Sequence, residues 1–140
     1  MSLDVTALRA SFELVVTRAP DLTSRFYEVL FARYPQAQAL FGRNTRRAQA
    51  DMLATALAAV LDHLEDAPWL SRTLGALGEK HVGYGVTEEM YGWVGDALLA
   101  TLAEVAGAEW TPALAKAWTD AYGAIASLMQ AGAARVASAA

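Results

Sequence analysis

The chain contains two histidines, and His81 is the one whose position is best suited to chemistry. His81 follows Leu77 by four residues and Leu74 by seven, so on a helix the three side chains share one apolar face. Histidine is a common metal ligand, although a lone histidine on an apolar face is more often a hydrogen-bonded core residue. The spacing alone leaves both interpretations open, a metal ligand and an ordinary core side chain.

The other residue types offer little reactive chemistry. The chain has no cysteine, which excludes disulfides, thiolate metal sites and cysteine nucleophiles. No pair of carboxylates lies on an apolar face and serines are scarce, so neither a hydrolytic triad nor an acid–base dyad is predicted. His63 lies beside Asp62 and close to Glu65 near the end of its expected helix, and we interpret it as a solvated surface residue.

A metal bound by His81 would need ligands that the protein does not supply. A protein-only site needs three or more ligands, and the apolar surroundings of His81 offer none. The remaining ligands would therefore come from a cofactor. An iron porphyrin meets this requirement, because it asks the protein for one axial imidazole and an apolar slot.

Length and composition predict a single all-α domain over residues 1–140. Hydrophobic residues make up 55% of the chain and proline occurs at four positions, and alanine and leucine lose little entropy in a helix. The formal net charge of −4 argues against a nucleic-acid partner held through its phosphates. The N-terminus lacks the pattern of a signal peptide and no apolar run could cross a bilayer, so we expect a cytoplasmic protein without a membrane partner.

Apolar spacing and helix-ending residues predict about six main helices and one short turn. The expected segments are residues 4–18, 21–34, the turn 35–42, and then 46–65, 68–81, 87–107 and 111–131. Asp4 or Ser2, Asp21, Thr87 and Thr111 are expected to cap four of the helices. The alanine-rich segment after Ala131 is expected to fray.

Five segments carry a familiar pattern in their order and spacing. They read FYEVLFARYP at residues 26–35, LF at 40–41, LGEKHVGYGV at 77–86, YGWVG at 91–95 and AWTDAYG at 117–123. Together they resemble the globin family, most closely the bacterial single-domain globins and the haem domains of flavohaemoglobins. The resemblance spans nearly the whole chain. It implies a globin fold, in which a three-over-three sandwich of helices encloses haem b (iron protoporphyrin IX).

The same resemblance implies roles for individual residues. His81 would be the proximal ligand of the haem iron, and Phe41 would wedge the haem in place. Tyr27 and Gln49 would face the bound diatomic ligand, with Leu53 shaping its access. The other expected cofactor contacts are Lys80 at a haem propionate, Tyr91 near His81, and Leu77, Val94, Tyr122 and Met129 along the pocket wall.

Each of these roles has a structural alternative. Tyr27 could be a core tyrosine whose hydroxyl bonds to backbone, and Gln49 could face solvent because the start of its helix is defined only to within a residue or so. Phe41 by itself would be an ordinary core residue. Lys80 and the pocket-wall residues follow from the resemblance alone.

The expected function is reversible O2 binding for storage, delivery or scavenging. A hydroxyl donor such as Tyr27 would stabilise bound O2, which carries partial negative charge, by roughly 1.5–3 kcal/mol. Gln49 can add an amide donor, whereas CO stays nearly neutral and gains less. NO is a further ligand, and the alternative function is nitric-oxide dioxygenase activity with an external reductase, because no reductase module follows Ala140. A gas sensor ranks third.

One departure from the family concerns the proximal side. Flavohaemoglobins place a glutamate eleven residues after the tyrosine that Tyr122 matches, and this chain has Ala133 there. Without that carboxylate, the His81 imidazole gains less anionic character. We therefore expect weaker O–O bond cleavage and a chain suited to holding O2.

Overall fold

The structure, a computed structural model, describes residues 4–41 and 46–139, and over these ranges it contains helices and no strand. The helices are α1 (Val5–Arg18), α2 (Leu22–Arg33), the 3₁₀ helix η1 (Pro35–Phe41), α3 (Arg46–Asp62), α4 (Ala67–Gly83), α5 (Glu88–Ala106), the 3₁₀ helix η2 (Gly107–Glu109) and α6 (Pro112–Ala139). The expected all-α class is confirmed. None of the helices in the described ranges has the length and apolarity needed to span a bilayer.

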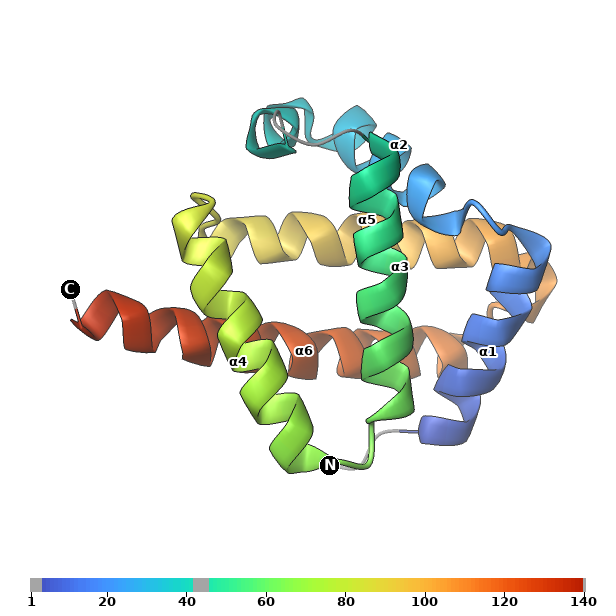
Figure 1. Cartoon of the computed structure of the whole chain (residues 1–140). Coiled ribbons are helices and arrows are strands. Elements are labelled where there is room, and N and C mark those ends of the chain that lie inside the picture. Colours follow the sequence, from blue (N-terminus) through green and yellow to red (C-terminus); the bar gives the residue numbers. More distant parts are fainter. Residues whose placement is uncertain (1–3, 42–45, 140) are drawn as a thin grey trace.

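The helices form two crossing layers (Figure 1). α5 and α6 run alongside each other, and α3 and α4 cross over them. α2 packs on α5 and α3, whereas α1 packs on α3, α5 and α6. This is the expected three-over-three arrangement, and it brings α4, with His81, across α6.

Local side-chain chemistry explains most helix boundaries. Asp4 accepts a hydrogen bond from the N–H of Ala7, and Thr111 accepts one from the N–H of Leu114, each at 3.1 Å. Both expected caps are therefore confirmed. Asp21 occupies the N-cap of α2 without a side-chain capping bond.

Two helix ends differ from the expected ones by three residues or more. α3 ends at Asp62, because a tight turn follows in which the N–H of Asp66 bonds to the carbonyl of His63. Asp66 then caps α4 by accepting from the N–H of Trp69. At the other end of the chain, α6 continues to Ala139, since alanine has the highest helix propensity of all residues.

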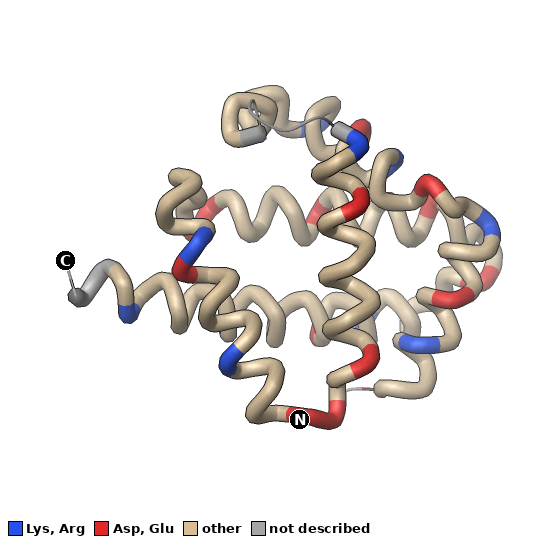
Figure 2. The backbone as a smooth tube through the Cα atoms, in the orientation of Figure 1, with Lys and Arg blue, Asp and Glu red and all other residues tan. Residues whose placement is uncertain are grey.

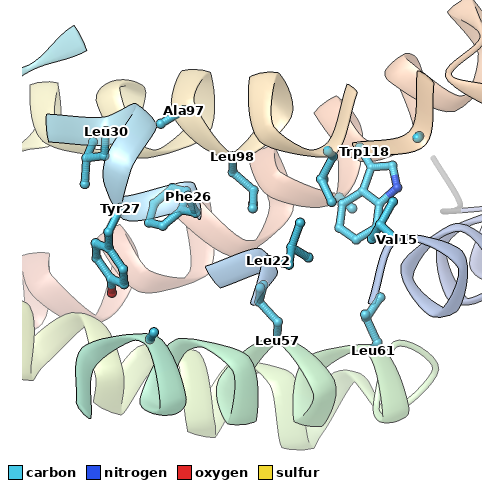
Figure 3. Close-up of a cluster of buried hydrophobic side chains, with 14 of the residues drawn as sticks. Val15, Leu22, Phe26, Tyr27, Leu30, Leu57, Leu61, Ala97, Leu98 and Trp118 are labelled. Carbon is cyan, nitrogen blue, oxygen red and sulfur yellow. The ribbon is translucent and has the colours of Figure 1, made fainter. Parts of the chain in front are cut away.

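The larger core cluster lies between α2, α3 and α5 and extends to α1 and α6 (Figure 3). Leu22, Phe26 and Leu30 of α2 are buried there with Leu57 of α3 and Leu98 of α5. Toward α1, the indole N–H of Trp118 donates to the hydroxyl of Ser11 at 2.9 Å. The one polar atom of this large buried ring is thereby satisfied.

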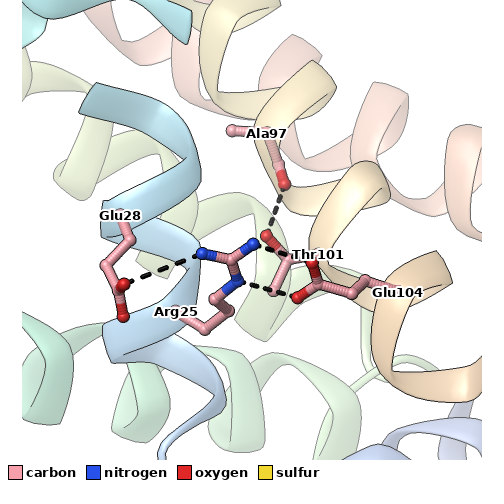
Figure 4. Close-up of polar contacts among 5 residues, drawn as sticks. All are labelled: Arg25, Glu28, Ala97, Thr101 and Glu104. Carbon is pink, nitrogen blue, oxygen red and sulfur yellow. Dashed lines mark hydrogen bonds and ion pairs between the residues drawn. The ribbon is translucent and has the colours of Figure 1, made fainter. Parts of the chain in front are cut away.

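A bidentate ion pair joins α2 to α5 (Figure 4). Arg25 donates from Nε and Nη2 to the two carboxylate oxygens of Glu104, both at 2.7 Å, and Glu28 lies 3.7 Å away. The Arg25 guanidinium lowers the pKa of the Glu104 carboxyl. A bidentate pair constrains orientation as well as distance, and this one joins α2 to α5 two residues before Tyr27.

Candidate functional site

His81 lies in the last turn of α4, where the chain is held by several backbone bonds. The carbonyl of His81 accepts from the N–H groups of Tyr84 and Val86, both at 3.1 Å. Gly85 adopts a φ of 85°, a conformation that other residues rarely reach. These contacts end α4 at Gly83 and fix the backbone beneath His81.

The imidazole of His81 is held in one tautomer. Its Nδ1 lies 2.8 Å from the carbonyl oxygen of Leu77, and a carbonyl only accepts, so Nδ1 carries the proton and Nε2 the lone pair. Nε2 has no hydrogen-bond partner in the part of the chain that the structure describes. Burial lowers the pKa of His81, opposed by the bond to Leu77. A neutral imidazole with an unused Nε2 is the form that binds a metal.

The donor set around His81 fits an iron porphyrin. Among the described residues, no group of three or more His, Asp or Glu side chains could hold a metal ion by itself. The residues one and two turns before His81 are apolar, with Leu77 half-buried and Leu74 buried. One imidazole and an apolar wall are what haem requires of a protein.

The wall behind His81 is a second core cluster between α3, α4, α5 and α6. It brings together four residues expected in the pocket, with Tyr91 and Met129 buried and Leu77 and Tyr122 partly buried. The hydroxyl of Tyr122 donates to the carbonyl of Tyr91 at 2.6 Å. A Cβ at Gly95 would lie 2.7 Å from the Tyr122 ring, so glycine there allows the ring to approach α5.

The expected placement of Tyr91 beside His81 has no direct contact to support it. No hydrogen bond or ring contact joins the two within the described residues, and the ring that contacts His81 is Tyr84, at 5.5 Å between centroids. Burial raises the pKa of Tyr91 and, more strongly, that of Tyr122. Both phenols therefore stay neutral at physiological pH.

A close crossing of α4 and α6 supports the same cluster. A Cβ on Gly78 would overlap the backbone carbonyl of Met129, and one on Gly132 would overlap that of Gly75. The sequence reasoning missed these glycines. Gly75 and Gly78 lie three residues apart on one face of α4, and this spacing was the available signal.

Tyr27 lies on the other side of the site, on α2. It is 5% exposed and packs edge-on against Phe26, with 4.9 Å between ring centroids. Its hydroxyl points from α2 toward the side on which α3 lies (Figure 3). Burial raises the pKa of Tyr27 to about 12, so at physiological pH the phenol keeps its proton and can donate a hydrogen bond.

The remaining expected site residues are placed less tightly. Leu53 and Val94 are half-buried and pack against the cluster that contains Tyr27. Gln49 is half-buried near the start of α3, and Lys80 is exposed next to His81. The side chain of Phe41 lies outside the described residues.

The expectation for His63 was wrong. Its ring is half-buried and stacks on Trp69, with 3.8 Å between centroids and 9° between planes. Its Nδ1 donates to the carbonyl of Ala59 at 2.8 Å. The α3–α4 turn, which the sequence predicted only as a break, brings the two rings together.

The half-buried imidazole of His81 should make the stability of the chain depend on pH. Burial lowers its pKa in the folded chain, so the folded state binds fewer protons than the unfolded state near the ordinary histidine pKa of about 6.5. The contribution of His81 is fully present above that pH and is lost as the pH falls. We propose urea unfolding of the haem-free chain at pH 7.5 and at pH 5.5. Between these two values, the free energy of unfolding should fall less for His81→Gln than for wild type. An equal fall in the free energy of unfolding of both proteins would contradict a lowered pKa of His81.

Comparisons with known proteins agree with this geometry. A family model described as globin matches residues 24–129. The flavohemoprotein of Bordetella pertussis is 34% identical over 132 residues, which are 92% of this chain and 33% of that protein. The flavohemoprotein of Rhodopirellula baltica is 33% identical over 117 residues, which are 82% and 29% of the two chains. The chain thus spans about a third of the length of these relatives.

Two solved structures resemble the chain over nearly its full length. An engineered carbene transferase, described as a putative nitric oxide dioxygenase from Rhodothermus marinus, has a TM-score of 0.84 and 27% identity. The alignment covers 96% of this chain and 94% of that one. A bacterial globin from Campylobacter jejuni has a TM-score of 0.81 and 25% identity, with 96% of each chain covered.

Proposed function

Because the chain belongs to the globin family, we propose that it binds haem b through His81 and carries O2 reversibly. Residues 1–140 would act as one globin domain. When bound, haem iron supplies reversible binding of O2 and of the related ligands CO and NO. The observation that carries the proposal is the His81 ring, whose Nδ1 is occupied by Leu77 and whose Nε2 is left for a ligand bond.

The residues of this chain would divide the remaining tasks. His81 holds the cofactor, and the apolar side chains of Leu77 and Met129 exclude water behind it. Val94, Tyr122 and Leu53 extend the pocket wall, Phe41 wedges the cofactor, and Lys80 pairs with a propionate. Tyr27 and Gln49 present donors to the bound gas.

The experiment that tests this proposal compares O2 dissociation from wild type and Tyr27→Phe. The phenol of Tyr27 is neutral and buried, so its hydrogen bond to partially charged O2 is worth roughly 1.5–3 kcal/mol, about one to two decades in rate. We expect stopped-flow O2 dissociation to be about 10- to 100-fold faster in the variant. CO dissociation, the internal control, should change much less. An unchanged O2 rate would remove Tyr27 from its proposed role.

A second candidate function is nitric-oxide dioxygenase activity, the oxidation of NO to nitrate with O2. It is favoured by the similarity to flavohemoproteins and to a protein described as a putative nitric oxide dioxygenase. Such turnover needs a reductase as partner. Consumption of NO under O2, measured with a supplied reductase and NADH, distinguishes the two functions, and negligible turnover would leave O2 carriage.

A further inference from the structure

An open groove lies between the start of α2 and the first turns of α3. Its volume is about 510 Å³, within the range that accommodates small ligands. Its lining includes Asp21, Thr23, Ser24, Arg47, Ala50 and Asp51. None of them belongs to the residues proposed to hold haem.

Thr23 is a largely buried residue that lines this groove. The residue is 9% exposed, and its hydroxyl makes no hydrogen bond within the described residues. Every fully shielded side-chain nitrogen or oxygen of that part has a partner, so the Thr23 oxygen is not fully shielded, and Thr23 lines the groove. A ligand in the groove can form a hydrogen bond with this accessible hydroxyl.

Two backbone N–H groups at the start of α2 are further donors at this groove. The N–H of Leu22 bonds to the carbonyl of Ala19, and the N–H of Arg25 bonds to that of Asp21. Between them, the N–H groups of Thr23 and Ser24 have no acceptor in the described ranges, and Asp21 makes no side-chain capping bond. Two N–H groups and two hydroxyls therefore lie at the positive end of α2.

The charged groups of the groove are also unpaired. Within the described residues, Arg47, Asp21 and Asp51 form no ion pair or side-chain hydrogen bond. A basic position followed by an acidic one is visible at the start of α3 (Figure 2). The lining holds two carboxylates, one guanidinium and a helix N-terminus equivalent to about half a positive charge, so the groove is close to neutral and contains groups of both signs.

We propose that this groove binds a small zwitterion of the free α-amino acid class. The ammonium group is recognised by Asp21 and Asp51. The carboxylate is recognised by Arg47 and the N–H groups of Thr23 and Ser24, with the Thr23 hydroxyl as an additional donor. A ligand of one sign alone would satisfy one set of groups and leave the other unpaired.

A ligand in the groove would lie next to the helical turns that carry the proposed gas-binding residues. Thr23 precedes Tyr27 by four residues on α2, and Ala50 follows Gln49 on α3. Binding in the groove would therefore affect the positions of the helical turns that carry Tyr27 and Gln49. This consequence rests on the proposed function, whereas binding in the groove does not.

Nuclear magnetic resonance of the ¹⁵N-labelled chain, titrated with L-serine, tests the binding directly. We expect saturable shifts of the backbone amides of Thr23, Ser24 and Ala50. Acetate and methylammonium, which each carry one of the two charges, should bind several-fold more weakly. Absence of saturable shifts with L-serine, or equal binding of acetate, would overturn the proposal. The readout follows amides and leaves the haem proposal untouched.

Variants identify the groups involved. Thr23→Val keeps the shape of the side chain and removes only an unbonded hydroxyl, so we expect unchanged thermal stability and about two- to tenfold weaker L-serine binding. Arg47→Gln and Asp51→Asn should each weaken binding about two- to fivefold. Arg72→Gln, an exposed change on α4, is the matched control. Undiminished binding in all three groove variants would place L-serine elsewhere and refute the proposal.

Discussion

His81→Gly should abolish retention of haem, and added imidazole should restore it. The substitution removes the side chain whose Nε2 is proposed to bind iron and leaves an imidazole-sized space beside the carbonyl of Leu77. Free imidazole can occupy that space and donate to the same carbonyl while its second nitrogen binds iron. The measurement is the Soret absorbance of the purified variant after haem addition and gel filtration, with and without imidazole.

The chain offers a matched control in its second histidine. His63 makes the same kind of bond, from Nδ1 to the carbonyl four residues earlier, and is also half-buried. Any effect that comes only from losing this bond or from adding glycine to a helix end will appear in His63→Gly as well. We expect His63→Gly to keep its Soret band. A full Soret band in His81→Gly without imidazole would disprove the ligand assignment.

The features that the sequence could predict are those set by nearby residues. The spacing of Leu74, Leu77 and His81 predicted a shared face of one helix, and all three are buried or half-buried in the structure. The caps at Asp4 and Thr111 were predictable for the same reason, because a cap is a bond between residues three positions apart. Helix periodicity and capping therefore gave the element order and the face that carries His81.

Contacts between distant segments could not be predicted in this way. The hydroxyl of Tyr122 bonds to α5 across 31 positions, and Arg25 pairs with Glu104 across 79. Neither residue type requires such a partner, so neither contact could be predicted from the sequence. His63 shows the opposite error, since the charged residues near it suggested solvent while its ring packs on Trp69.

The glycines of α4 are the clearest case of a long-range feature hidden in the sequence. Read locally, Gly75 and Gly78 weaken a helix by roughly 1 kcal/mol each relative to alanine. In the structure they lie against α6, where a Cβ on Gly78 would overlap the backbone of Met129 and one on Gly75 would lie 2.8 Å from the guanidinium of Arg135. Their cost to α4 is offset by the close crossing, and the spacing of the two glycines does not identify which helix approaches them.

Gly78→Ala should therefore destabilise the chain, although alanine favours the helix. The new Cβ would overlap the carbonyl oxygen of Met129, which belongs to the α6 backbone and cannot rotate away. Relief requires α4 to move off α6, and overpacking of this kind costs roughly 3 kcal/mol at its upper end. Gly78 precedes His81 by three residues, so the same movement should also displace the proposed haem ligand. We expect a lower urea midpoint and faster transfer of haem to an acceptor globin.

Gly123→Ala on α6 separates this clash from the effect of helix propensity. A Cβ at Gly123 meets nothing within 4 Å, so alanine there should stabilise the chain by about 0.5–1 kcal/mol. Both substitutions add one methyl group to a helical glycine, and only the neighbouring atoms differ. Opposite shifts of the unfolding midpoint would identify the α4–α6 contact as the cause. If Gly78→Ala were as stable as Gly123→Ala, the close crossing of α4 and α6 would not exist in solution.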